Sequence, residues 1–74
     1  MKKVNLNKIK RLRNKHKLSQ GDMAGIIGLS NLYPYHRKES GVQSFTAEEI
    51  HAIASFFKKP VEYFFDDEIA ESAI

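Results

Sequence analysis

The sequence contains no cysteine, and this absence limits how so short a chain can be held together. Neither a disulfide nor a thiolate metal site is available, so the 74 residues must fold by packing alone. A chain of this length lies near the lower limit for a self-sufficient core. We therefore expect a single, efficiently packed domain. The lack of cysteine also fits a reducing cytosol.

Long apolar segments are also missing. No run of apolar residues approaches the roughly 18 residues that a membrane span needs, so no membrane association is expected. Lys2 and Lys3 resemble the start of a signal peptide, but polar residues interrupt any apolar region after them. These interrupting residues are Asn5, Asn7, Lys8 and Lys10. We therefore expect the mature chain to begin at Met1.

Acidic residues are scarce in the first part of the chain. Residues 1–45 hold ten Lys or Arg but only Asp22 and Glu39, a net charge of +8. Residues 46–74 hold two Lys and seven acids, a net charge of −5. A basic N-terminal part attracts a polyanion, while an acidic C-terminal part limits nonspecific binding. Accidental clustering on a solvated surface gives the same counts, so the charge supports nucleic acid without identifying it.

What the chain does have is helical periodicity. Residues 6–16 carry apolar side chains at i, i+3 and i+4 spacing and predict an amphipathic helix with a basic polar face. Ser19 and Asp22 form a capping box that opens a second helix, which Gly28 ends in the left-handed conformation. The apolar residues expected to face the core are Val4, Leu6, Ile9, Leu12, Leu18, Met23, Ala24, Ile26, Ile27, Ile50, Ile53, Ala54, Phe57, Val61, Phe64 and Phe65.

Asparagine and proline determine where the third helix begins. Pro34 lacks an N–H group and is tolerated only in the first turn of a helix. With Asn31 as the N-cap, Pro34 occupies the third helical position. With Ser30 as the N-cap, it would occupy the fourth, where a backbone hydrogen bond is lost. We therefore expect the third helix to begin after Asn31 and to be closed by Gly41.

The rest of the chain completes the expected fold. Thr46 and Glu49 form a second capping box, followed by apolar residues at helical spacing. Pro60 is placed to open a short fifth helix. Residues 66–74 form an acidic tail that is either frayed or in contact with a partner. Because no repeat, linker or strand-like alternation is present, we expect an all-α bundle of five helices in which residues 1–65 form one domain.

Several short pieces of sequence occur in a recognisable order. They are Leu12-Arg13, Leu18-Ser19-Gln20, Met23-Ala24, Ile27-Gly28, Tyr35, Arg37-Lys38-Glu39-Ser40-Gly41, Phe45-Thr46, Glu49-Ile50 and Tyr63-Phe64-Phe65. Together they resemble the Cro/repressor (XRE-type) helix-turn-helix domains of phage repressors and small bacterial regulators. The resemblance covers about three quarters of the chain. One departure concerns the turn, where Asn31 lies one residue further from Gly28 than the family usually has it, which leaves the docking angle open.

The resemblance implies a sequence-specific transcriptional regulator that binds double-stranded DNA, a small cytoplasmic repressor acting as a homodimer on a palindromic operator. When bound to DNA it would be associated with the nucleoid. Its third helix would enter the major groove, with Leu32, Tyr33, His36 and Arg37 pointing outward and Tyr35 toward the core. Arg37 is the best specificity candidate, because guanidinium can donate two bonds to guanine. Leu32 and Tyr33 would contact a thymine methyl or the sugar-phosphate backbone. The alternatives are that they are only solvent-exposed apolar residues near a helix start, or that they join the core.

The phosphate contacts are expected around this helix. Gln20 lies in the first turn of the second helix, where backbone N–H groups favour a phosphate, and in resembling proteins it also braces the reading helix. The other expected phosphate contacts are Lys10, Arg13, Lys17, Lys38, Ser40, Gln43 and Ser44. The family commonly has an ion pair at the positions of Arg13 and Glu39. We expect the same pair here, linking the first and third helices and aiming Arg13 toward phosphate.

Other functions are less well supported by the sequence. His16, His36 and His51 stand on three different helices without metal-ligand spacing, and no nucleophile–base pair stands out, so we expect no enzyme, metal or cofactor. The alternative function is a protein-interaction module of the antitoxin or antirepressor type. Its partner-binding residues would be Phe64, Phe65, Ile69 and Ile74. RNA binding ranks third, because Tyr33 is the lone clear stacking candidate.

Overall fold

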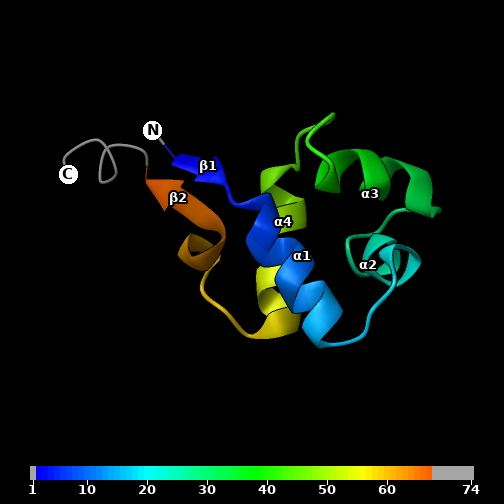
Figure 1. Cartoon of the computed structure of the whole chain (residues 1–74), viewed down its shortest axis with the longest axis horizontal. Helices are drawn as coiled ribbons and strands as arrows, with labels where there is room; N and C mark the ends of the chain where they lie inside the picture. The colour runs from blue at the N-terminus through cyan, green and yellow to red at the C-terminus, as the bar shows by residue number, and fades with distance from the viewer. Residues whose placement is uncertain (1, 68–74) are drawn as a thin grey trace.

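The computed structural model describes residues 2–67 and is mostly helical (Figure 1). The α-helices are α1 (Leu6–Lys15), α2 (Gln20–Ile26), α3 (Leu32–Glu39) and α4 (Ala47–Phe57). A 3₁₀ turn, η1 (Val61–Phe64), follows them, and two short strands, β1 (Lys2–Val4) and β2 (Phe65–Asp67), flank the helices in the sequence. The expected helical fold is confirmed at this level. The expectation of five α-helices is wrong, because the described residues form four.

The expected fifth helix is a single 3₁₀ turn. Pro60 precedes it in an extended conformation, and no side chain caps its start. Directly after Phe64 the chain becomes extended and enters β2. Four residues between an extended cap and a strand leave no room for a regular α-helix. Pro60 therefore starts a helical turn, as expected, but not an α-helix.

The two strands form an antiparallel pair that the sequence did not lead us to expect. The register joins Lys2 to Asp67, Lys3 to Asp66, and Val4 to Phe65. The pairing continues beyond the strands, since the backbone N–H of Asn5 donates to the carbonyl of Phe64 at 2.7 Å. Val4, which was expected to face the core, lies in β1 and packs against the core from there. The domain boundary expected after Phe65 falls inside β2, and tail residues 68–74 lie outside the described residues.

Both expected capping boxes are present. In each, the hydroxyl of the N-cap accepts from the backbone N–H three residues later, and the acid there accepts from the N-cap N–H in return. For Ser19 and Asp22 these bonds are 3.0 and 2.9 Å long. For Thr46 and Glu49 they are 3.1 and 2.9 Å long. These local bonds satisfy donors that helix starts would otherwise leave unpaired, which explains where α2 and α4 begin.

The turn between α2 and α3 also follows the sequence signals. Gly28 has a φ of +83°, the left-handed conformation that ends α2. Asn31 is the N-cap of α3, and its side chain accepts from the backbone N–H of Tyr33 at 3.0 Å. Pro34 is thus the third residue of α3, as expected, and its missing N–H leaves no bond unmade. The confirmed cap sets the phase of α3, and with it the side chains that face outward.

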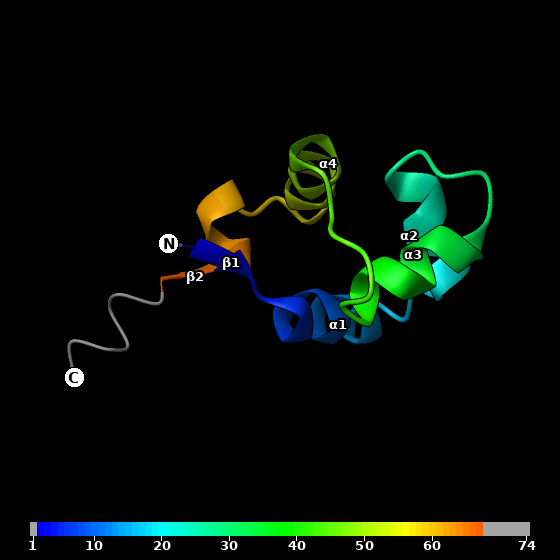
Figure 2. The same cartoon turned by 90° about the horizontal axis from the view of Figure 1, so that it is seen from above.

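The helices bury one face each in a common core. Its fully or nearly buried apolar residues are Ile9, Leu12, Met23, Ala24, Tyr35, Ile50, Ile53, Ala54, Phe57 and Phe64. From above, α1 and the end of α3 lie along one side of the molecule and α4 along the other (Figure 2). Among the helices, α2 and α3 have the most extensive mutual contact. Within residues 2–67, no helix is both long and apolar enough to cross a bilayer.

Candidate nucleic-acid interface

Helix α3 has one buried and one open side. Tyr35, Lys38 and Glu39 are 0%, 4% and 2% exposed and face the rest of the protein. The four residues expected to contact bases are all exposed, namely Leu32, Tyr33, His36 and Arg37. Leu32 and Tyr33 are 50% and 69% exposed, so the alternative that they join the core is wrong. The outer side of α3 therefore presents apolar, aromatic and basic groups together.

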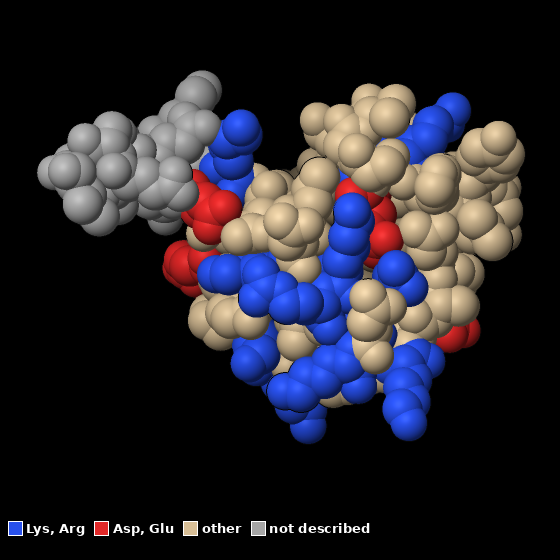
Figure 3. All heavy atoms as spheres, viewed as in Figure 1, with Lys and Arg blue, Asp and Glu red and all other residues tan. Residues whose placement is uncertain are grey.

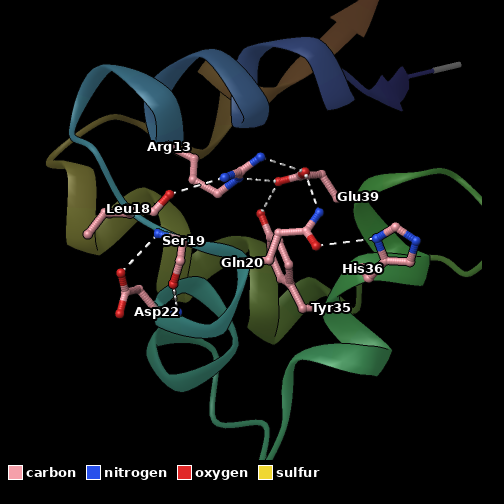
Figure 4. A network of polar contacts seen from close by, with 8 residues as sticks. All are labelled: Arg13, Leu18, Ser19, Gln20, Asp22, Tyr35, His36 and Glu39. Carbon is pink, nitrogen blue, oxygen red and sulfur yellow. Dashed lines mark hydrogen bonds and ion pairs between the residues drawn. The ribbon is translucent and has the colours of Figure 1, made fainter.

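The buried side of α3 is held by a polar network centred on Glu39 (Figure 4). Its carboxylate accepts from Nε and Nη2 of Arg13 at 2.8 and 3.1 Å, which confirms the expected ion pair. It also accepts from the hydroxyl of Tyr35 at 2.6 Å and from Nε2 of Gln20 at 3.0 Å. Arg13 Nη1 donates to the carbonyl of Leu18 at 3.1 Å. One carboxylate thus ties α3 to α1 and α2.

Protonation states in this network follow from its geometry. Burial tends to raise the pKa of Glu39, but the hydrogen bonds from Arg13, Tyr35 and Gln20 outweigh it and hold that pKa below the ordinary 4.5. Burial, together with the bond to Glu39, raises the pKa of Tyr35. The hydrogen bond to Glu39 likewise raises the pKa of Arg13. At neutral pH, Glu39 is an ionised acceptor and its neighbours are donors.

Gln20 extends the network to the outer side of α3. While its Nε2 donates to Glu39, its Oε1 lies 3.3 Å from Nδ1 of His36 (Figure 4). The bracing of α3 expected from Gln20 is therefore present. The bond to Glu39 uses one of the two N–H groups of Nε2, so the phosphate contact expected from Gln20 stays a prediction. His36 is consequently both an exposed residue of α3 and the outermost member of the network centred on Glu39.

Lys38, which was expected to contact phosphate, instead forms an ion pair inside the protein. Its side chain is 5% exposed, and Nζ donates to Oε1 of Glu49 at 2.7 Å and to the carbonyl of Ser44 at 3.2 Å. Burial tends to raise the pKa of Glu49, but the bond from Lys38 and the Thr46 backbone bond lower it overall. The Lys38 ammonium thus joins α3 to the start of α4. Because it faces inward, we correct its assignment from phosphate contact to structural ion pair.

The other expected phosphate contacts differ in what they offer. Arg13 is largely enclosed, with a side chain 16% exposed and three of its N–H groups bound to Glu39 and Leu18, so it is chiefly structural. Ser40 is exposed, but its hydroxyl donates to the carbonyl of Arg37 at 3.1 Å. Lys10 and Ser40 line the same open hollow between α1 and the end of α3. The remaining expected contacts are exposed, namely Lys10, Lys17, Gln43 and Ser44.

The expected phosphate contacts left out part of the basic face of α1. A hollow of about 390 Å³ beside Tyr63 is lined by Lys8, Arg11, Lys15 and Lys59, and no acid within residues 2–67 lines it. The ammonium groups of Lys8 and Lys59 lie 4.6 and 4.9 Å from the ring centroid. Figure 3 shows Lys and Arg side chains gathered across the face that carries α1. The i, i+3, i+7 spacing of the first three was a usable signal, whereas Lys59 stands in the acidic half.

The described residues hold no group of three or more metal-ligating side chains of His, Cys, Asp or Glu. No known protein-family model matches the sequence, and no curated protein matches it significantly. Function is therefore inferred from the residues of this chain and from their arrangement.

Proposed function

We propose that the protein is a sequence-specific transcriptional regulator that binds double-stranded DNA, a small cytoplasmic repressor of the Cro/repressor (XRE) type. In this proposal α2, the turn after it and α3 are a helix-turn-helix, and α3 enters the major groove. One observation carries the proposal. The side of α3 that bears Leu32, Tyr33, His36 and Arg37 is exposed, while Glu39 on its other side is bound by both neighbouring helices.

The chemistry of the exposed residues suits base edges. The guanidinium of Arg37 can donate two parallel bonds to O6 and N7 of guanine, an interaction that contributes about 1–3 kcal/mol of discrimination. Leu32 and Tyr33 offer apolar surface for a thymine methyl or the sugar-phosphate backbone. One such helix reads only a few base pairs. We therefore propose a homodimer on a palindromic operator, with half-sites about one helical turn apart.

The basic surface over α1 supplies the part of the affinity that does not depend on sequence. Lys10 and Lys17 are exposed, and Lys8, Arg11 and Lys15 line a hollow to which no acid of the described residues contributes. Cations that neutralise phosphates release bound counterions, so DNA binding must weaken as salt rises.

The test is a selection from random duplex DNA followed by anisotropy titrations between about 50 and 200 mM salt. We expect an enriched palindrome and a linear fall of log affinity with log salt. Arg37→Ala should weaken binding to that sequence roughly tenfold or more while leaving random duplex little affected. Lys10→Ala, the matched control, should weaken binding to all sequences alike and reduce the salt slope by about one. A flat slope, or no enriched sequence, would contradict the proposal.

No observation favours the interaction-module alternative. Phe64, one of its expected partner-binding residues, is fully buried, and Phe65 is partly buried in β2. Ile69 and Ile74 lie outside the described residues. The apolar surface assigned to a partner is therefore not available in the part of the chain that the structure describes.

A further inference from the structure

We propose that His36 reads DNA as a hydrogen-bond acceptor, because Gln20 and Glu39 determine which nitrogen of its ring carries the proton. The tautomer is a property of the free protein. Only the base preference derived from it rests on the proposed function. The inference makes Gln20 a positioning residue for sequence specificity, a role different from the phosphate contact expected for it.

The first step is the orientation of the Gln20 amide. An ionised carboxylate has no proton to donate, so it must be met by a donor. Glu39 already accepts from Arg13 of α1 and Tyr35 of α3, and it accepts from Nε2 of Gln20 at 3.0 Å. Turning the amide would place its oxygen against this carboxylate. The carbonyl end, Oε1, is therefore directed to the opposite side, toward His36.

The second step is the position of the imidazole proton. Oε1 of Gln20 is an acceptor, and it lies 3.3 Å from Nδ1 of His36. A hydrogen bond between them requires that Nδ1 carry the proton. In the neutral ring, Nε2 is then left with a lone pair and no proton. Figure 4 shows the other ring nitrogen pointing away from the network, and the side chain is exposed.

The third step is what a bare Nε2 can recognise. In the major groove, adenine N6 and cytosine N4 are the amino donors, while guanine presents N7 and O6 and thymine presents O4, all acceptors. A neutral His36 held in this tautomer can therefore bond adenine or cytosine but not guanine or thymine. A histidine free to exchange its proton between the two nitrogens could bond either class. By fixing the tautomer, the network thus limits His36 to bases that present an amino donor.

The tautomer is tested in the free protein by long-range ¹H–¹⁵N NMR of labelled histidine at about pH 8, where imidazole is neutral. We expect His36 to carry its proton on Nδ1, whereas His51, exposed on α4, should show the Nε2–H form that unconstrained histidine favours in water. Gln20→Met removes the acceptor at similar size and should return His36 to Nε2–H. Gln43→Met, a glutamine of the exposed α3–α4 loop, should leave His36 unchanged.

An Nε2–H form of His36 in the unsubstituted protein would overturn the inference, and this spectrum decides even if Gln20→Met does not fold. An unchanged tautomer in folded Gln20→Met would overturn it as well, because another group would then hold the proton.

The base preference is tested by the DNA selection at the same pH. We expect one position in each half-site to favour adenine or cytosine, and His36→Ala to reduce that preference roughly fivefold or more while the Arg37-dependent position keeps its own. Guanine or thymine at the His36-dependent position would overturn the reading role. If no duplex is enriched at all, the proposed function and the base preference both fail, while the NMR result on the tautomer stands.

Discussion

Among single residues, Glu39 is a buried carboxylate with three side-chain partners, Arg13, Gln20 and Tyr35. Its carboxylate is 2% exposed at the residue level and accepts four hydrogen bonds, from side chains of α1, α2 and α3. Removing one member of a buried ion pair leaves the other without compensation. Arg13 would lose two of its bonds in this way, and the hydroxyl of Tyr35 would lose its acceptor.

We therefore expect Glu39→Gln to lower the free energy of unfolding by about 3–5 kcal/mol, because the neutral amide cannot compensate the guanidinium of Arg13. Urea denaturation of both proteins at neutral pH measures the difference. Glu62→Gln, which removes an exposed acid of η1, is the matched control and should change stability by no more than about 0.5 kcal/mol. Unchanged stability and DNA affinity in Glu39→Gln would refute the structural role of the pair.

At the scale of elements, α2 is short and carries two glycines among seven residues. Glycine in a helix interior is unfavourable relative to alanine by roughly 0.5–1 kcal/mol. A methyl group added at Gly25 would meet no atom within 4 Å. The turn glycine, Gly28, has equally open surroundings, but its φ is +83°. The two positions differ in backbone conformation, not in the room available for a methyl group.

This contrast gives a matched pair of variants. Gly25→Ala should raise the free energy of unfolding by about 0.5–1 kcal/mol, because the helical backbone accepts alanine and the unfolded chain loses freedom. Gly28→Ala should lower it by about 1–2 kcal/mol, because alanine is strained in the left-handed region. Thermal unfolding of both variants beside the parent checks the two signs. If both substitutions stabilised the protein, or if neither did, backbone conformation would not be the cause of the difference between Gly25 and Gly28.

The elements also show what the sequence could and could not predict. Helix starts were predictable because their signals are local, as with Ser19 and Asp22 or with Asn31 before Pro34. The β1–β2 pair was missed because each strand has three residues, too few for alternation, and its partner lies about sixty residues away. The same holds for Lys38, whose burial depends on a carboxylate of another helix. Long-range pairing left no local pattern in either case.

The candidate site was predictable to a similar extent. Once the N-cap of α3 was placed, helical geometry alone put Leu32, Tyr33, His36 and Arg37 outward, where the structure has them. The link between Gln20 and His36 was not predictable, because it joins two helices whose relative placement depends on packing. Composition likewise predicted that the N-terminal part of the chain is basic. It did not predict that the basic side chains of α1 lie on two different sides of the helix.

For the whole molecule, we expect the free energy of unfolding to depend on pH because of three carboxylates with lowered pKa values. Bonds from the Ser19 backbone and hydroxyl lower the pKa of Asp22, and the networks described above lower those of Glu39 and Glu49. Their ordinary values are 3.8 for Asp22 and 4.5 for the two glutamates. Since each folded-state pKa lies below the unfolded-state value, the unfolded chain binds more protons in acid, and stability falls as pH is lowered.

We expect the free energy of unfolding to change little above about pH 5 and to decline progressively below about pH 4.5. Urea midpoints measured from neutral pH down to about pH 3 give this profile. Glu39→Gln, if it folds, should show a shallower decline, because one of the three groups no longer titrates. A midpoint that stays constant into acid would mean that these carboxylates are no better solvated or paired in the folded protein than in the unfolded chain.

The ribbon of β1 and β2 brings the first and last described residues together, with Lys2 opposite Asp67. Figure 1 places this ribbon at one end of the molecule and α3 at the other. A fluorophore or fusion partner attached next to Lys2 or Asp67 would therefore start from the end of the described structure that lies away from α3. The closeness of these two positions also suits circular permutation of residues 2–67, in which a short linker joins them and new ends are cut in an exposed connection.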